Sequence, residues 1–148
     1  LDFGRFRVYL KDKYKVEKAF LFIGHVSGNE LLYTQLQKDG YIVIFKPTLA
    51  IKRGKKIVVK GNVDAELVLH SMIEYPNYDK AIIISGDGDF HCLVKYLAQK
   101  SRLLKLMAPS RSGFSSLLRE FGEYVIFVED LKASLAKNVG GINLRTNP

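Results

Sequence analysis

Residues Ile82–Phe90 read Ile-Ile-Ile-Ser-Gly-Asp-Gly-Asp-Phe, an apolar run followed by two glycines and two aspartates. Its three isoleucines are apolar without alternation, which is typical of a strand buried on both faces of a parallel sheet. Gly86 and Gly88 allow the backbone to turn sharply after that strand. Asp87 and Asp89 therefore follow the carboxyl end of a buried strand, where open α/β sheets bind their ligands. The stretch predicts an α/β domain with a functional site at this edge of its sheet.

Helical and strand patterns alternate along the rest of the chain. Strands are predicted over residues 19–23, 41–45, 80–85, 103–107 and 124–128. Helices are predicted over residues 5–14, 30–39, 62–73, 90–99, 113–121 and 129–135. This alternation favours a three-layer α/β/α (Rossmann-like) domain with a mostly parallel central sheet. We expect the domain to occupy residues 1–137 and residues 138–148 to form a flexible tail.

A third carboxylate, Asp64, lies in the first turn of the helix predicted over residues 62–73. The positive end of the helix dipole stabilises a negative charge there, and Asn62 is a suitable N-cap for the same helix. Three acids at element ends favour a metal site, because Mg²⁺ and Mn²⁺ prefer oxygen ligands with few carboxylates and several waters. The alternative is that Asp64, Asp87 and Asp89 only cap or complement helices.

The chain is basic, and part of its positive charge is concentrated in one segment. The 148 residues carry a formal net charge of +8 at pH 7, and no acid occurs between residues 46 and 60. This favours a polyanionic partner, above all nucleic acid. The segment is interpreted as a hairpin or long loop whose cations contact nucleic-acid phosphates, with a solvated hairpin tip as the alternative. These cations are Lys52, Arg53, Lys55, Lys56 and Lys60.

A second phosphate-binding candidate follows the strand predicted over residues 103–107. Residues 110–116 read Ser-Arg-Ser-Gly-Phe-Ser-Ser and precede a helix. Hydroxyls and backbone amides at such a position can hold a phosphate, with Arg111 assisting. Ordinary N-capping of the helix is the preferred interpretation.

The composition excludes several other classes of protein. Hydrophobic residues make up 47% and charged residues 26% of the chain, as in soluble globular proteins. No apolar run is long enough to span a bilayer, so we expect no membrane association. The single cysteine excludes an intramolecular disulfide and indicates a reducing compartment, hence a cytoplasmic location. The histidines have no partners at zinc-binding spacing.

Two motifs in this order resemble a known family. Residues 60–69 read Lys-Gly-Asn-Val-Asp-Ala-Glu-Leu-Val-Leu, and residues 78–90 end in Ser-Gly-Asp-Gly-Asp-Phe. Together they are similar to the NYN domain, the LabA-like branch of the PIN-like nuclease superfamily. The similarity extends to residues 20–24 and 36–41 and covers the chain from about Phe3 to Val128.

The resemblance implies a metal-dependent endoribonuclease that hydrolyses RNA phosphodiesters with Mg²⁺ or Mn²⁺ as its cofactor. Asp64, Asp87 and Asp89 would be the catalytic and metal-binding acids, and Ser85 the small hydroxyl residue before the acidic turn. Members of the family begin with an apolar strand ending in a further Asp, whereas Asp2 has no apolar run before it. This departure predicts a PIN-like domain that is incomplete at its N-terminus. It would be a fragment, be completed by another chain, as in a homo-oligomer, or have lost catalysis.

Three functions therefore remain open from the sequence. The first is a metal-dependent endoribonuclease, and the second is a non-catalytic RNA-binding or regulatory module on the same fold. The third is an assembly domain whose acids only cap helices. Metal-dependent RNA cleavage that is lost on Asp87→Asn would select the first, and RNA binding without cleavage would select the second.

Overall fold

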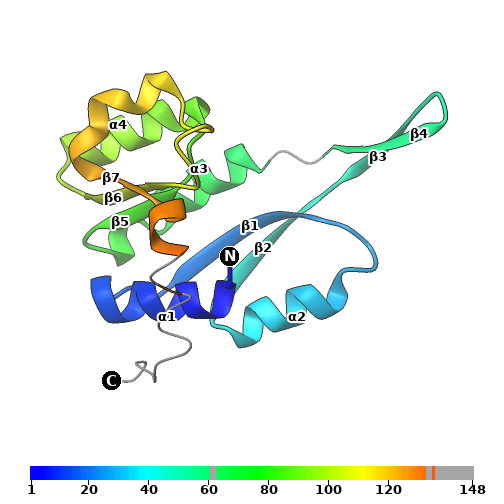
Figure 1. Cartoon of the computed structure of the whole chain (residues 1–148), viewed down its shortest axis with the longest axis horizontal. Helices are drawn as coiled ribbons and strands as arrows, with labels where there is room; N and C mark the ends of the chain where they lie inside the picture. Colours follow the sequence, from blue (N-terminus) through cyan, green and yellow to red (C-terminus); the bar gives the residue numbers. More distant parts are fainter. Residues whose placement is uncertain (61–62, 133–134, 136–148) are drawn as a thin grey trace. The chain divides into compact units, whose positions relative to one another are not determined.

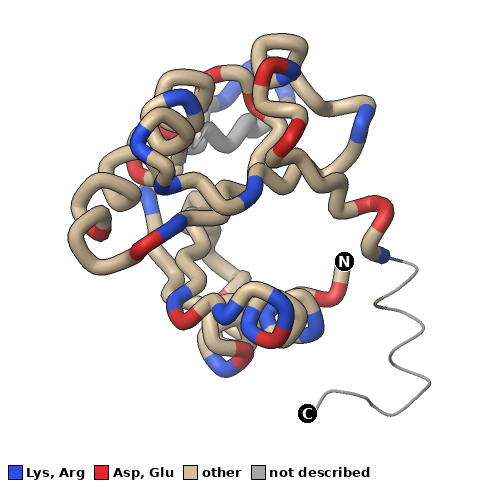
Figure 2. The backbone as a smooth tube through the Cα atoms, turned by 90° about the vertical axis from the view of Figure 1, so that its left-hand side faces the viewer, with Lys and Arg blue, Asp and Glu red and all other residues tan. Residues whose placement is uncertain are grey.

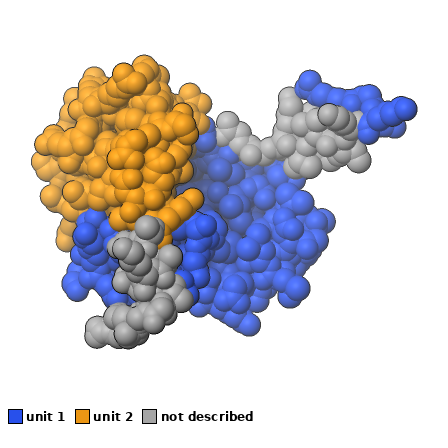
Figure 3. All heavy atoms as spheres, in the orientation of Figure 1, with its two compact units in different colours: residues 1–67 blue, residues 68–148 orange. Residues whose placement is uncertain are grey.

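The computed structural model describes residues 1–60, 63–132 and 135 (Figure 1). The chain divides into two compact units, Leu1–Leu67 (unit 1) and Val68–Pro148 (unit 2), which Figure 3 shows in different colours. Each unit contains parallel β-strands and helices, so the predicted α/β class is confirmed. The tail predicted over residues 138–148 lies outside the described residues.

Unit 1 begins with a repeated helix and strand pattern. Its elements are α1 (Phe3–Tyr14), β1 (Ala19–His25), α2 (Glu30–Lys38) and β2 (Tyr41–Pro47). Strands β1 and β2 pair in parallel, with Ala19 opposite Tyr41. Apolar side chains from α1 and α2 are buried in the core of the unit, among them Phe6, Leu10 and Leu36. The predicted helices and strands of this region are confirmed, and each differs from the prediction by two residues or fewer at its ends.

The N-terminus of α1 explains the role of Asp2. The Asp2 carboxylate accepts a hydrogen bond of 3.1 Å from the backbone amide of Arg5 and caps the helix. A buried arginine then connects this helix to the loops before β1 and β2. Arg7 donates hydrogen bonds to the backbone carbonyls of Val16, Glu17 and Gly40 at 3.2, 2.8 and 3.3 Å. These bonds satisfy the guanidinium, which would otherwise be costly to bury.

Tyr41, at the start of β2, gives unit 1 a measurable pH dependence. Burial raises the pKa of Tyr41 to about 12, and its hydroxyl donates a 2.7 Å hydrogen bond to the carbonyl of Phe3. A tyrosine in an unfolded chain ionises near pH ~10. The contribution of the buried phenol to the free energy of unfolding is therefore complete below pH ~10 and is lost as the pH rises towards ~12.

We expect Tyr41→Phe to remove this part of the alkaline loss of stability, because phenylalanine cannot ionise. The urea midpoint, followed by far-UV circular dichroism, should fall less between pH ~9 and ~12 in the variant than in the native chain. Equal decreases in the two proteins would contradict the assignment.

The last two strands of unit 1 form a hairpin, as predicted for the basic segment. Strands β3 (Leu49–Arg53) and β4 (Lys56–Lys60) are antiparallel, and Gly54 in the turn has a φ of +62°. This left-handed conformation favours glycine. Among the described residues, neither strand pairs with any third strand, and Figure 1 draws the hairpin as a two-stranded ribbon.

Unit 2 contains a three-stranded parallel sheet in the order β5–β6–β7. Its elements are α3 (Asp64–Ile73, which begins in unit 1), η1 (Tyr75–Asn77), β5 (Ala81–Ile84), η2 (Gly88–Phe90), α4 (His91–Gln99), β6 (Leu103–Ala108), η3 (Ser116–Tyr124) and β7 (Val125–Phe127). Both α4 and η3 pack on β6. The largest fully buried side chains of this core are Val94, Leu97, Leu106, Met107 and Leu118. No helix in the described part of the chain combines the length and apolar character of a membrane-crossing segment.

Three details of the fold differ from the sequence-based expectation. The strand β5 is not buried on both faces, since Ile83 is buried but Ile84 is 41% exposed. The described residues form two parallel sheets, β1–β2 and β5–β6–β7, because no ladder joins strands of the two units. The helix predicted over residues 113–121 is a 3₁₀ helix, Ser116–Tyr124. The backbone of Phe121 within this element is not helical (φ −97°, ψ 22°), so a kink interrupts it, and its buried residues are Leu118 and Phe121.

Candidate metal centre

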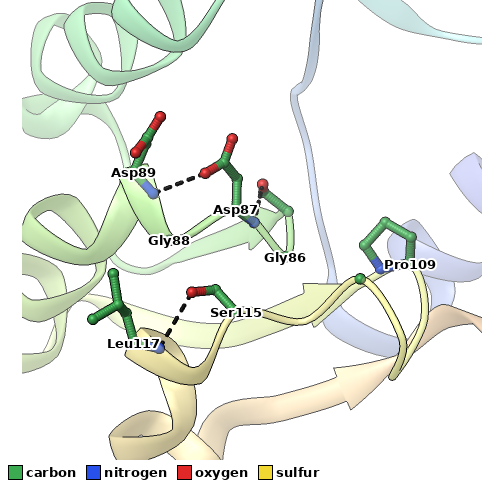
Figure 4. Close-up of a pocket in the computed structure, with 9 residues that line it drawn as sticks. Gly86, Asp87, Gly88, Asp89, Pro109, Ser115 and Leu117 are labelled. Atoms are coloured by element: carbon green, nitrogen blue, oxygen red, sulfur yellow. Dashed lines mark hydrogen bonds between the residues drawn. The ribbon is translucent and has the colours of Figure 1, made fainter.

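The acidic turn directly follows β5, as the sequence predicts. The Ser85 hydroxyl accepts a 3.1 Å hydrogen bond from the backbone amide of Asp87. The Asp87 carboxylate then accepts a 2.8 Å bond from the backbone amide of Asp89 and caps η2. Figure 4 shows the two carboxylates on the same side of this turn. Both side chains are exposed, so they are accessible to a ligand.

A second loop packs so closely on the acidic turn that only glycine fits. The Gly86 carbonyl accepts a 2.9 Å hydrogen bond from the amide of Ser115. A Cβ on Gly86 would lie 2.9 Å from the Gly113 carbonyl oxygen, and one on Gly88 would lie 2.5 Å from the Ser115 hydroxyl. The glycines of the sequence motif therefore serve close packing as well as the turn itself.

An open pocket of about 580 Å³ lies at the carboxyl ends of β5 and β6. It falls in the size range of ligand-binding pockets, roughly 300–1,000 Å³. Its lining consists of Ser85, Gly86, Asp87, Gly88, Asp89, Pro109, Gly113, Ser115 and Leu117 (Figure 4). Hydroxyls, two carboxylates and small residues thus surround a space at the edge of a parallel sheet where α/β proteins bind ligands.

Asp64 begins α3, where the helix dipole favours its negative charge. The boundary between the two units lies within this helix, after Leu67, and the helix continues to Ile73. An ion pair of 3.4 Å between Lys46 and Glu66 connects the end of β2 to the first turn of α3. Further along, the Tyr78 hydroxyl donates a 2.8 Å hydrogen bond to the carbonyl of Ser71. Both ends of α3 are therefore held by neighbouring elements.

The three predicted acids come together. One carboxylate oxygen from each of Asp64, Asp87 and Asp89 lies within 4.8 Å of the other two, with Asp64 partly buried. Ligand oxygens at ~2.1 Å from a magnesium ion are separated by about 3 Å when adjacent and about 4.2 Å when opposite. The donor set therefore fits one hydrated divalent cation with small side-chain rotations. Such an ion would also offset the mutual repulsion of three carboxylates.

The other predicted site residues have different surroundings. Asn62 lies outside the described residues, so its role as an N-cap stays a prediction. Lys52, Arg53 and Lys55 are exposed on the β3–β4 hairpin. The backbones of Lys56 and Lys60 belong to β4.

Arg111 is held by acids rather than exposed to the pocket as a free cation. Its guanidinium donates two 2.8 Å hydrogen bonds to the two carboxylate oxygens of Asp130 and a further bond to Glu129. These hydrogen bonds lower the pKa of Asp130 and raise that of Arg111. The guanidinium also lies 4.4 Å from the centre of the Phe127 ring. A contact of Arg111 with phosphate stays a prediction, and it would require competition with these partners.

Sequence reasoning missed one wall of the pocket. Pro109, Gly113, Ser115 and Leu117 line it, and of these only Gly113 and Ser115 belong to the predicted phosphate-binding segment, residues 110–116. The Ser115 hydroxyl accepts a 3.2 Å bond from the amide of Leu117, which is the N-capping that the sequence favours. The order of the strands could have indicated this wall, because loops after adjacent parallel strands meet at the same edge of a sheet.

Comparison with solved structures finds a similar fold in a crystal structure of a protein of unknown function from Vibrio parahaemolyticus. The TM-score is 0.68 and the sequence identity 23%, and the match covers 87% of this chain and 79% of that chain. A likeness at this identity establishes the fold alone. No curated protein matches the chain. The family model of the NYN domain matches residues 1–129, which include all three acids. The chain therefore belongs to the NYN domain family, whose fold is of the nuclease type.

Proposed function

We propose that this chain is a metal-dependent ribonuclease that hydrolyses RNA phosphodiester bonds at the pocket beside Asp87 and Asp89. The observation that carries the proposal is the convergence of the carboxylates of Asp64, Asp87 and Asp89 within 4.8 Å in a member of the NYN domain family. Three acids so close together repel one another, and a divalent cation is the partner that relieves this repulsion. We further propose that the cation is Mg²⁺ or Mn²⁺, since the ligands are all oxygen atoms.

The residues of the chain have separate tasks in this proposal. Asp64, Asp87 and Asp89 would hold the cation, and the α3 dipole supports the charge on Asp64. A bound divalent ion offsets negative charge on the phosphate and favours ionisation of the attacking water. Ser85 and Asp87 fix the turn through their hydrogen bonds to backbone amides. This fixed geometry matters because such catalysis depends on positioning and on charges already in place.

The openness of the pocket supports a polymeric substrate and an endonucleolytic cut. The pocket is bounded by the acidic turn and the loop at Gly113 and Ser115 (Figure 4). A phosphodiester inside a longer strand needs such an open groove, because the strand must leave the site in both directions. We therefore propose internal cleavage rather than removal of terminal nucleotides.

A non-catalytic RNA-binding or regulatory module is the second candidate. The observation that favours it is the hydrogen bond from the amide of Asp89 to the Asp87 carboxylate, which gives this acid a structural role without any metal. A protein of this kind would bind RNA with the same surfaces and leave it intact.

Cleavage of a fluorescently labelled 20-nucleotide RNA by the full chain distinguishes the two candidates. We expect internal cuts with Mg²⁺ or Mn²⁺, no cuts with excess EDTA, and recovery when the metal is restored. A DNA strand of the same sequence serves as the control for the sugar. RNA binding without cleavage under all metal conditions would support the second candidate, and cleavage that persists in EDTA would contradict the metal-dependent mechanism.

Two further properties are proposed with this function. The first is a cytoplasmic location, because Cys92 is exposed and unpaired, which suits a reducing compartment.

The second is a homo-oligomer, proposed from the exposed apolar residues of α2 and α3, of which Leu31 is 89% and Leu69 is 58% exposed. Sedimentation of the full chain over a range of concentrations would test the second property.

A further inference from the structure

The β3–β4 hairpin is a structural element without a partner strand. Each of its strands has five residues, and among the described residues they pair only with each other. A two-stranded hairpin of this size is marginally stable in water by itself. We therefore expect the hairpin to be stabilised by contact with a binding partner.

The charge of the hairpin identifies the chemistry of that contact. Five of its residues are Lys or Arg, and no acid occurs between residues 40 and 63. Residues 90–119 also contain no acid, but their six Lys and Arg residues are spread over 30 positions, whereas four of the hairpin's cations lie within five positions. Figure 2 marks Lys and Arg in blue and Asp and Glu in red along the backbone. Lys52, Arg53 and Lys55 are exposed around the turn. Such a concentration of exposed positive charge attracts a polyanion.

We propose that the β3–β4 hairpin (residues 49–60) is an arm that binds the phosphate backbone of the RNA substrate. The proposal deepens the proposed function, since it names the surface that holds the strand outside the cleavage pocket. Lysine and arginine on a ribbon without base-stacking side chains at its tip contact phosphates rather than bases. The arm therefore contributes affinity without sequence preference.

Chain connectivity keeps the base of this arm near the acidic site. Four peptide units separate Lys60 from Asp64. They span at most about 14 Å when fully extended, at ~3.6 Å per residue. Phosphates along one strand of a duplex are about 3.4 Å apart along its axis, so roughly four of them cover this distance. One RNA strand of modest length can thus contact both the arm and the acids.

An arm outside the chemistry has a distinct kinetic signature. It holds the substrate equally in the ground state and in the transition state, so its loss raises KM and leaves kcat unchanged. Its contribution also falls as salt rises, by about 0.7 slope units for each phosphate contact with a single strand.

The test uses the full chain with Lys52, Arg53, Lys55 and Lys56 each replaced by Gln. The matched control has Lys11, Lys38, Lys95 and Arg119 each replaced by Gln. These four residues are exposed and carry the same total charge as the four residues of the arm. Binding to a labelled 20-nucleotide RNA is measured by fluorescence anisotropy in EDTA at several salt concentrations. We expect the arm variant to bind at least about 10-fold more weakly at low salt and to lose about two to three units of salt slope, whereas the control loses much less. Circular dichroism verifies that both variants are folded.

The outcomes separate the arm from the catalytic proposal. Binding in EDTA does not depend on cleavage, so an arm-dependent affinity without any cleavage supports the arm and overturns only the nuclease. Equal losses of RNA affinity in the arm variant and the control would show an effect of net charge and overturn the arm. An RNA affinity that is unchanged in both variants would also overturn it, as would the absence of RNA binding by the native chain. If the protein cleaves RNA, the arm variant should have a higher KM for the 20-nucleotide RNA. Its rate of cleavage of a dinucleotide, which is too short to reach the arm, should equal that of the native chain.

Discussion

Asp87→Asn is expected to reduce metal-dependent RNA cleavage by about 100-fold or more, the size of effect seen when one charge-stabilising group is removed from a preorganised site. The substitution removes one of the three charges that lie within 4.8 Å of one another. It keeps the local structure, because the asparagine oxygen can still accept the 2.8 Å hydrogen bond from the amide of Asp89. Asparagine is also as good an N-cap as aspartate. The loss would therefore report the missing charge rather than unfolding.

The matched control for this experiment is Asp79→Asn. Asp79 is exposed, lies before β5 and does not line the pocket, so its replacement makes the same change in net charge outside the site. The single-turnover rate of the control should stay within about threefold of the native rate, as expected for a substitution away from the reacting groups. Asp87→Asn with a native rate would show that the carboxylate has only its capping role.

Gly86→Ala is expected to destabilise the protein by about 1–3 kcal/mol, the usual cost of forcing an extra group into a well-packed site. The new Cβ would lie 2.9 Å from the carbonyl oxygen of Gly113, which is backbone and cannot rotate away. The same shift would strain the hydrogen bond from the amide of Ser115 to the Gly86 carbonyl. Since both loops line the pocket, we expect cleavage to fall together with stability.

Gly122→Ala is the control, because a Cβ on Gly122 would meet no atom within 4 Å. We expect it to change the free energy of urea unfolding by less than about 1 kcal/mol. Equal stability of the two alanine variants would mean that the acidic turn and the loop at Gly113 are not packed as described.

The acidic turn could be predicted from the sequence because its signals are local. An unbroken apolar run predicts the strand that became β5, although that strand is only partly buried. Two glycines predict the turn that presents Asp87 and Asp89. Asp64 could be placed in a first helical turn for the same reason. The meeting of the three carboxylates was predicted because each acid lies at the end of an element, two after a strand and one in the first turn of a helix.

Features that depend on distant parts of the chain could not be predicted. The contact between Gly86 and Gly113 joins residues in separate loops, and no local pattern specifies it. The ion pair of Arg111 with Asp130 is likewise set by packing across 19 residues of sequence. The division into two parallel sheets depends on which strand edges meet, which the alternating pattern leaves open. The 3₁₀ winding of η3 and its kink at Phe121 are likewise not specified by the local apolar pattern.

Crystals of the full chain soaked in Mn²⁺ reveal whether the three carboxylates hold a metal ion, because the ion can be located by its anomalous scattering. We expect one strong peak at about 2.1–2.5 Å from carboxylate oxygens of Asp64, Asp87 and Asp89, and its loss in Asp87→Asn. Manganese bound elsewhere, with none at these three carboxylates, would contradict this expectation.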